Sequence, residues 1–228
     1  MSTAGKLRVL AAGAALSCLF PQPAGAQADD ARVAAVVERI APNLVALRHD
    51  LHRHPELSNR ETRTAGVIAR ELRRLGLEVR EGIAKTGVVG ILRGARPGPV
   101  VGVRADMDAL PVTEATDLPF KSVARTEYLG RETGISHACG HDIHVAVALG
   151  VAEVLAGQRD RLAGTVVFIF QPAEEGATPG AKGGALLMIE EGVMRDPAPA
   201  ILVALHTNCG HPDEAGDWEQ IGRLAFTP

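Results

Sequence analysis

Apolar residues recur along the chain at two spacings, which predict helices that alternate with strands. Within 31–47 the apolar side chains lie three or four positions apart, the spacing of one helix face. The segments 61–75, 142–156 and 183–191 are also predicted to be helical. Short apolar runs bounded by glycine, proline or charged residues are typical of strands, and they occur at 77–80, 87–92, 99–106, 165–173 and 200–207.

The second predicted helix has recognisable signals at both ends. Ser58 and Glu61 match a capping box, in which Ser58 accepts the backbone N–H of Glu61 and the Glu61 side chain reaches back. Gly76 is suited to end the helix because glycine adopts the left-handed conformation without strain. We therefore expect this helix to end at about Leu75.

The alternation of strands and helices predicts an α/β fold with a mostly parallel sheet flanked by helices. The runs at 99–106 and 200–207 are strongly apolar, so both are expected to be buried strands. In open α/β sheets a ligand binds beyond the carboxyl ends of the strands. We expect one crevice there, because polar residues end three of the predicted strands: Asp106, Asp108, Glu174, Glu175 and His206.

The first 26 residues have the pattern of a signal peptide. Lys6 and Arg8 precede the apolar run 9–20, and small residues follow at 24–26. Cleavage is predicted after Ala26, and the run is short for a membrane span, although an uncleaved anchor remains the alternative. Cleavage removes Lys6 and Arg8 and no acid, which changes the formal net charge from −3 to −5. A secreted or periplasmic protein without membrane association is expected.

Composition narrows the classes of protein further. Hydrophobic residues make up 46% of the chain, which indicates a packed core rather than global disorder. Aromatic residues make up only 3%, so the core is expected to be mainly aliphatic. The net charge of −3 gives no electrostatic reason to expect a nucleic-acid partner.

Metal-binding side chains are concentrated in the segment HACGHDIH, just before a predicted helix. Thiol and imidazole groups bind zinc and similar ions, and this segment offers them from Cys139, His141 and His144. The two-residue spacing of Cys139 and His141 allows both to reach one ion or two adjacent ions. The alternative is a helix start in which Asp142 faces the positive end of the dipole and the histidines are solvated. Glu174 and Glu175, farther along the chain, favour the metal site.

Glu174 and Glu175 are adjacent carboxylates at the end of a strongly apolar strand. Two like charges there are costly unless a cation compensates them. One carboxylate could bind a metal while the other acts as a base toward water that the metal acidifies. A solvated acidic loop is the alternative.

Two weaker signals accompany these residues. Asp106 and Asp108 share one face of a strand end, where they could bind metal or orient a histidine ligand, although aspartate is also common in turns. His49, His52 and His54 are interpreted as a helix end and a turn before Pro55.

The order of several motifs resembles the M20 metallopeptidase family. The amidohydrolase branch is the most similar, with its hippurate hydrolases, N-acyl-amino-acid hydrolases and indole-acetyl-amino-acid hydrolases. The resemblance runs from about residue 40 to the C-terminus. It is carried by LHRHPELSNRETRTA, KTGVVG, RADMDALPV, HACGHDIH, FQPAEEG and ALH.

The resemblance implies a partial M20-type catalytic domain that hydrolyses N-acyl amino acids or related small amides and peptides. Glu174 would be the general base that activates water and later protonates the leaving amine, and Asp108 would support the site. Two divalent ions, commonly manganese or zinc, would be bound by Cys139, His141, Glu175 and His206.

Family members are considerably longer than 228 residues. The resemblance therefore implies that 27–228 is the N-terminal part of the catalytic domain, without the lid and dimerisation domain and the C-terminal return segment. A truncated, catalytically inactive metal-binding fragment is the alternative, and the oligomeric state is left open. A metal-storage module is disfavoured because storage needs no free base beside Glu175.

Cys139 and Cys209 are the two cysteines that remain after cleavage. An oxidising compartment favours a disulfide between them. We hypothesise instead that Cys139 remains a metal thiolate, because metal binding competes with oxidation. Cys209 is an alternative extra ligand.

Overall fold

The computed structural model describes residues 24–177 and 180–207, and residues 1–23, 178–179 and 208–228 lie outside this description. All four predicted helices are confirmed. The first extends past its predicted end, to Arg53, and the third and fourth match within one residue at their starts. The helices are α1 (Ala24–Arg53), α2 (Thr62–Arg74), α3 (His141–Ala156) and α4 (Gly184–Glu190).

The predicted capping box at the start of α2 is wrong. Glu61 is the N-cap residue, but its side chain makes no capping hydrogen bond. Its buried carboxylate instead accepts hydrogen bonds from the hydroxyl of Thr86 and the backbone N–H of Ala173. The Ser58 hydroxyl donates to Asp108. The side chains of Ser58 and Glu61 both form hydrogen bonds with residues far away in the sequence, which a local pattern does not reveal.

The five predicted strands are present in one sheet, whose order is β1-β2-β6-β3-β7. A further hairpin of β4 (Arg125–Tyr128) and β5 (Arg131–Gly134) was not predicted, because its residues are mostly polar and carry no apolar alternation. The sheet strands are β1 (Glu78–Ile83), β2 (Gly87–Arg93), β3 (Arg96–Asp106), β6 (Ala163–Gln171) and β7 (Ile201–Ala204).

The predicted α/β fold is confirmed, and its sheet is mixed. β3 pairs in parallel with both β6 and β7. β2 pairs antiparallel with both β1 and β6. Four of the five described strands in this sheet therefore run in one direction, and β2 runs in the other.

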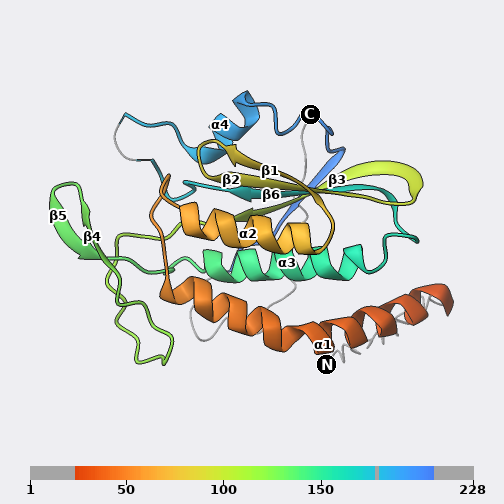
Figure 1. Ribbon diagram of the computed structural model, residues 1–228, viewed down its shortest axis with the longest axis horizontal. Helices are drawn as coiled ribbons and strands as arrows, with labels where there is room; N and C mark the ends of the chain where they lie inside the picture. The colour runs from red at the N-terminus through yellow and green to blue at the C-terminus, as the bar shows by residue number, and fades with distance from the viewer. Residues whose placement is uncertain (1–23, 178–179, 208–228) are drawn as a thin grey trace, which may run out of the picture.

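Helices cover both faces of the sheet (Figure 1). Alternate residues of β6 point to opposite faces, as the pleat requires. Phe168 and Phe170 pack beneath α2 and α3, whereas Val167 and Ile169 pack toward Met188 of α4. α1 lies outside this layer, against α3. The larger core therefore lies on the α2 and α3 side.

The prediction that 200–207 is a buried strand is wrong. β7 is an edge strand in the described part of the chain, and it pairs only with β3 there. The side chains of Ile201 and Val203 are 51% and 44% exposed. β3 is exposed over its first four residues and buried at Gly102, Ala105 and Asp106. Apolar content alone did not distinguish an edge strand from a central one.

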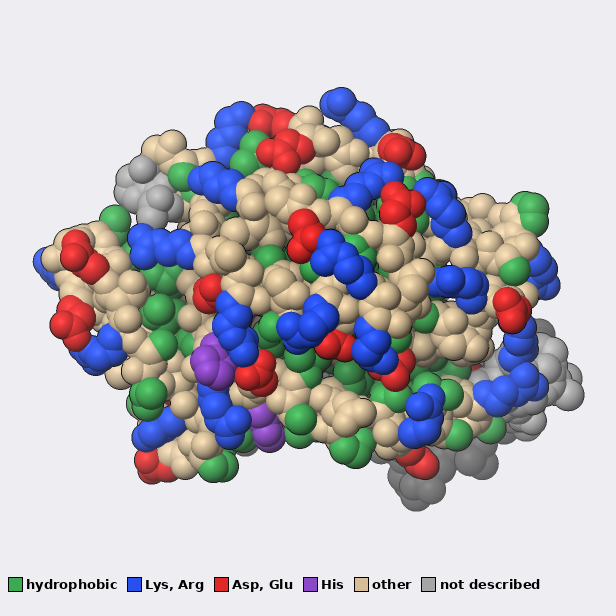
Figure 2. Space-filling model, viewed as in Figure 1, with side chains coloured by type: hydrophobic (Ala, Val, Ile, Leu, Met, Phe, Trp, Pro, Cys, Tyr) green, Lys and Arg blue, Asp and Glu red, His purple; other side chains and the backbone are tan. Residues whose placement is uncertain are grey.

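The face formed by the helices carries interspersed basic and acidic side chains (Figure 2). Arg74 of α2 pairs with Glu71 and with Glu153 of α3 at 2.8 and 2.9 Å.

Among the described residues, no helix is both long enough and apolar enough to span a membrane. The predicted signal peptide lies almost entirely within 1–23, outside the described residues, and remains a prediction.

Candidate metal centre

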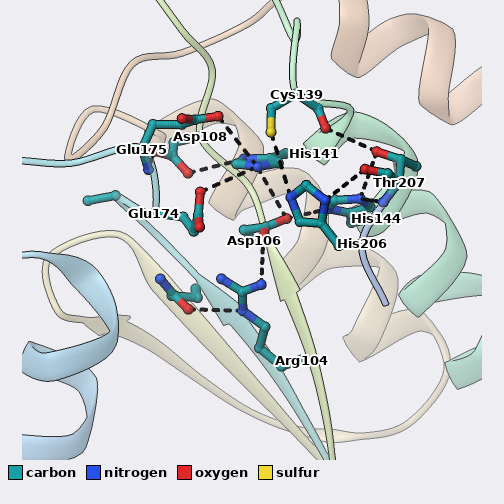
Figure 3. Close-up of polar contacts among 12 residues, drawn as sticks. Arg104, Asp106, Asp108, Cys139, His141, His144, Glu174, Glu175, His206 and Thr207 are labelled. Carbon is teal, nitrogen blue, oxygen red and sulfur yellow. Dashed lines mark hydrogen bonds and ion pairs between the residues drawn. The ribbon is translucent and has the colours of Figure 1, made fainter. Parts of the chain in front are cut away.

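The carboxyl ends of β3, β6 and β7 meet the start of α3 at one edge of the sheet, as the sequence predicted (Figure 3). His141 lies at the centre, and carboxylates approach it from the segments after β3 and β6. All six predicted site residues are brought together here: Asp108, Cys139, His141, Glu174, Glu175 and His206.

The His141 ring is fully buried. Its Nε2 lies 3.7 Å from an oxygen of Glu174 and 3.7 Å from Oε1 of Glu175. Its Nδ1 lies 3.3 Å from Oδ1 of Asp108. Nε2 of His141 and Oε1 of Glu175 are both buried without a hydrogen-bond partner among the described residues. Buried polar atoms left unpaired are costly, and a bound cation would satisfy both.

Cys139 and His206 form a second side of the site. The Cys139 sulfur lies 3.6 Å from Nε2 of His206. Nδ1 of His206 lies 2.7 Å from the carbonyl oxygen of Thr207 and so must carry the proton. The lone pair on Nε2 therefore faces the thiol, as a metal ligand requires.

Burial and the nearby Glu175 carboxylate raise the pKa of Cys139 to about 12. Cys139 is a free thiol in the described part of the chain. A cation must therefore displace the thiol proton when it binds. Cys209 lies outside the described residues, so its predicted roles in a disulfide or as a ligand remain predictions.

His144 supports the site rather than offering a free ligand atom. The backbone N–H of Thr207 donates to Nε2 of His144 at 2.8 Å, so Nδ1 carries the proton. Nδ1 lies 2.5 Å from Oδ1 of Asp106. The sequence suggested His144 as a possible ligand, but both of its nitrogens have protein partners in this structure.

Two overlapping groups of donor atoms are each close enough together to hold a metal ion. Each of two groups has all its donor atoms within 4.8 Å of one another, and both groups contain His141. Thiol, imidazole and carboxylate groups are common protein ligands of divalent metal ions. The first group is Cys139, His141 and Glu175, and the second is Asp106, His141, His144 and His206. Both nitrogens of His144 are already paired within the protein, so the free imidazole donors of the second group are His141 and His206.

The aspartates beside His141 are held in their charged form. Burial acts to raise the pKa of Asp106, but its hydrogen bond with His144 and the charges of His141 and Arg104 outweigh burial and lower it. Burial likewise acts on Asp108, whose contacts with His141 and the Ser58 hydroxyl lower its pKa overall. Two charged aspartates next to one histidine favour a positive charge between them, on a bound cation or on the imidazole ring.

Gly140 lets the chain pass from Cys139 to His141. It is the N-cap residue of α3 and has a φ of 83°, in the left-handed region. A Cβ at this position would overlap the hydroxyl of Thr207. Only glycine therefore allows both neighbouring side chains to face the same crevice.

Several supporting residues were not found from the sequence. Arg104 lies 2.6 Å from Oδ2 of Asp106, and the side chain of Gln171 accepts a hydrogen bond from Arg104. Arg104 precedes Asp106 by two positions on β3, so the period of a strand could have indicated it. Ser58 and Thr207 carry no such signal, because their partners come from distant segments.

The three histidines at the end of α1 agree with their interpretation as a helix end. α1 ends at Arg53, and His54 follows it. The His52 ring lies 2.8 Å from Asp142 and 3.2 Å from Glu114. These contacts tie α1 to the first turn of α3, next to His141.

The chain is similar to a family of peptidases and to several curated relatives. The model of peptidase family M20/M25/M40 matches residues 102–220, just over half of the chain. Thermostable carboxypeptidase 1 of Saccharolobus solfataricus is 48% identical over 159 residues, which are 69% of this chain and 38% of that protein. Hippurate hydrolase of Campylobacter jejuni is 44% identical over 147 residues, 64% of this chain and 34% of that protein. The chain thus spans little more than a third of these relatives.

A solved structure agrees in fold and in sequence. The YXEP protein of Bacillus subtilis, described as a dinuclear metal-binding peptidase of the M20 family, matches with a TM-score of 0.65 and 40% identity. The match covers 75% of this chain and 44% of that chain. Fold, sequence and clustered donor atoms agree, and the chain belongs to peptidase family M20/M25/M40.

Proposed function

We propose that the protein hydrolyses the amide bond of N-acyl amino acids or related small amides and peptides. Family membership supports hydrolysis, and relatives named for this chemistry support the substrate class. They include hippurate hydrolase of Campylobacter jejuni and N-acetylcysteine deacetylase of Bacillus subtilis, the latter 45% identical over 152 residues. The activity is proposed for the whole protein, since this chain spans only 37% of the deacetylase.

The proposed cofactor is a pair of divalent ions, manganese or zinc, held by Cys139, His141, Glu175 and His206. The observation that carries the proposal is the pair of unpartnered buried atoms, Nε2 of His141 and Oε1 of Glu175, beside the Cys139 thiol. Ions bound there supply Lewis acidity toward a substrate carbonyl and make water easier to deprotonate.

Glu174 is the proposed general base. It follows Ala173, and its side chain is 35% exposed, compared with 20% for Glu175. Glu175 is more enclosed and therefore better suited to bind an ion. Glu174 can accept a proton from water that enters from solvent and deliver it to the leaving amine.

The role of Glu174 is tested by Glu174→Gln in the natural, full-length protein. We expect hydrolysis of benzoyl-glycine to fall by about a thousandfold or more, since one positioned base contributes about 10²–10⁴-fold. Bound metal, measured by mass spectrometry of the elements, should remain near that of the unmodified protein. Glu190→Gln on α4 is the control, because that carboxylate is exposed and pairs only with Lys182 among the described residues.

Two results would contradict these assignments. Full activity of Glu174→Gln would remove Glu174 as the base. Metal binding by the full-length protein without hydrolysis of any N-acyl amino acid in a broad panel would favour a non-catalytic metal-binding protein. Metal analysis of protein purified from its own cells identifies the native ion.

We also propose that the protein is secreted or periplasmic, on the basis of the pattern in residues 1–26. N-terminal sequencing of the exported protein should begin at Gln27. An intact N-terminus on protein recovered only from the cytoplasm would contradict export.

A further inference from the structure

Glu61 is a buried carboxylate outside the group of proposed ligands. It is fully inaccessible to solvent, and burial raises its pKa despite its hydrogen bonds. Each oxygen accepts a hydrogen bond from another segment of the chain. The hydroxyl of Thr86 donates to Oε2 at 2.6 Å, and the backbone N–H of Ala173 donates to Oε1 at 2.9 Å. The three residues come from three segments that the resemblance singled out, ELSNRE, KTGVVG and FQPAEEG.

The partner of Glu61 on the β6 side has an unusual backbone conformation. Ala173 has a φ of 48°, in the left-handed region, where a residue with a Cβ is disfavoured by steric crowding. Its N–H is held by Glu61, and its carbonyl accepts the N–H of Gly184 at 3.3 Å. The next two residues are Glu174 and Glu175. The turn at Ala173 therefore sets the direction in which both carboxylates leave β6.

We propose that Glu61 is a positioning residue that holds the Ala173 turn and thereby aims Glu174 and Glu175 at His141. The inference rests on the proposed function of those two glutamates. Glu61 acts through the backbone and touches neither substrate nor ion. Asp108 makes the matching contact two residues later, where it accepts the N–H of Glu175 at 3.0 Å. Two buried carboxylates thus hold the backbone on either side of Glu174.

A purely structural role explains Glu61 less well. Glu61 is the N-cap of α2, yet its side chain makes no capping hydrogen bond. Burial of a charged group contributes little to stability when an apolar side chain of similar size would fill the same space. The contact is explained if the carboxylate is needed to keep Ala173 in a strained conformation beside the site.

The test uses three variants of the natural, full-length protein. Glu61→Ala removes the acceptor for the Ala173 N–H. Glu61→Gln keeps it, because the amide oxygen can accept from Ala173 while its NH₂ group donates to the Thr86 hydroxyl. Ala173→Gly, added to Glu61→Ala, tests the turn itself, because glycine adopts positive φ without strain.

The first readout is hydrogen exchange of the Ala173 amide, which does not depend on hydrolysis. In Glu61→Ala we expect exchange to speed up by about tenfold or more, as for loss of a hydrogen bond to a charged group. Glu61→Gln should keep the slow exchange. If the unmodified protein hydrolyses no amide, the proposed function fails, and this readout still decides whether Glu61 holds the turn.

The second readout is the division between kcat and KM. In Glu61→Ala, kcat for benzoyl-glycine should fall about 10–100-fold, because small misplacements of catalytic groups cost about 10²-fold. KM and bound metal should stay within about twofold, and Ala173→Gly should recover part of the lost kcat. Unchanged exchange at Ala173, or a loss of kcat that follows metal loss and is not recovered by Ala173→Gly, overturns the proposal.

Glu191→Ala is the matched control. Glu191 also accepts the N–H of a left-handed alanine, since Ala84 has a φ of 50° and donates to Glu191 at 2.7 Å. That turn carries none of the proposed ligands, so kcat should stay within about twofold of the parent.

If Glu61→Ala does not fold, Thr86→Val is used in its place. It removes the other hydrogen bond of Glu61 and should speed exchange at Ala173 by a smaller factor, and unchanged exchange would again overturn the proposal.

Discussion

The backbone N–H of Glu175 donates to Oδ2 of Asp108 across 3.0 Å. The same oxygen accepts the hydroxyl of Ser58 at 2.7 Å, and the other oxygen lies 3.3 Å from His141. One carboxylate after β3 therefore fixes the loop after β6 and the first residue of α3 at the same time. This cross-link between strand ends holds the candidate metal ligands together.

Replacement of Asp108 by asparagine should weaken metal binding while the protein stays folded. The amide cannot provide an acceptor to Ser58 and Glu175 and a negative charge to His141 together. Loss of such a supporting group typically lowers metal affinity by about 10–100-fold. Titration calorimetry with Zn²⁺ or Mn²⁺ measures the change. Ser58→Ala serves as the milder control, and an unchanged affinity in Asp108→Asn would contradict this role.

Metal binding should release the Cys139 proton. Because the pKa of this thiol is raised to about 12, it is protonated at neutral pH in the absence of metal. Affinity should therefore increase with pH, and Cys139→Ser should release about one proton fewer per protein. Calorimetry in buffers with different ionisation enthalpies counts the protons. Equal proton release by the two proteins would show that Cys139 does not bind as a thiolate.

The sequence predicted the convergence of site residues because each one ends a strand or begins a helix. Asp106, Glu174 and His206 all follow apolar runs, and strands that run in one direction end at one edge. What it could not predict were long-range partners. From the sequence, Glu61 matches a local capping pattern. Only the folded structure shows that its carboxylate instead accepts hydrogen bonds from Thr86 and Ala173.

The sequence also did not predict that β7 is an exposed edge strand. Its run of aliphatic residues matches a central strand in composition, yet Ile201 and Val203 lie at an edge in the described part of the chain. The β4–β5 hairpin was missed for the opposite reason. Its strands pair through mostly polar residues such as Thr126 and Thr133, and Tyr128 alone packs against a small apolar cluster, so no apolar alternation marks them.

His52 should make stability depend on pH. Its ring nitrogens face Asp142 at 2.8 Å and Glu114 at 3.2 Å. The hydrogen bond with Asp142 outweighs burial and raises the pKa of His52 above 6.5. The stabilisation is therefore complete below the unfolded pKa and is lost as pH rises through the folded pKa. His52→Gln should cost about 1.5–3 kcal/mol at about pH 6, and less at about pH 9.

Urea unfolding at the two pH values measures this difference. His54→Gln is the control, because the side chain of His54 is about half exposed and pairs within its own segment, with Asp50. The pKa of Asp142 is lowered, chiefly through the His52 contact acting against burial, so its own contribution is lost only as the solution becomes strongly acidic. A cost for His52→Gln that grows from pH 6 to pH 9 would contradict the account.

Anomalous X-ray diffraction from crystals grown with Zn²⁺ or Mn²⁺, recorded at the absorption edge of the ion, tests most directly whether metal binds at this site. Two anomalous peaks are expected beside His141, bounded by Cys139, Glu175 and His206. Peaks elsewhere, or no peak at this edge of the sheet in crystals of metal-saturated protein, would contradict the assignment of these residues to a metal centre.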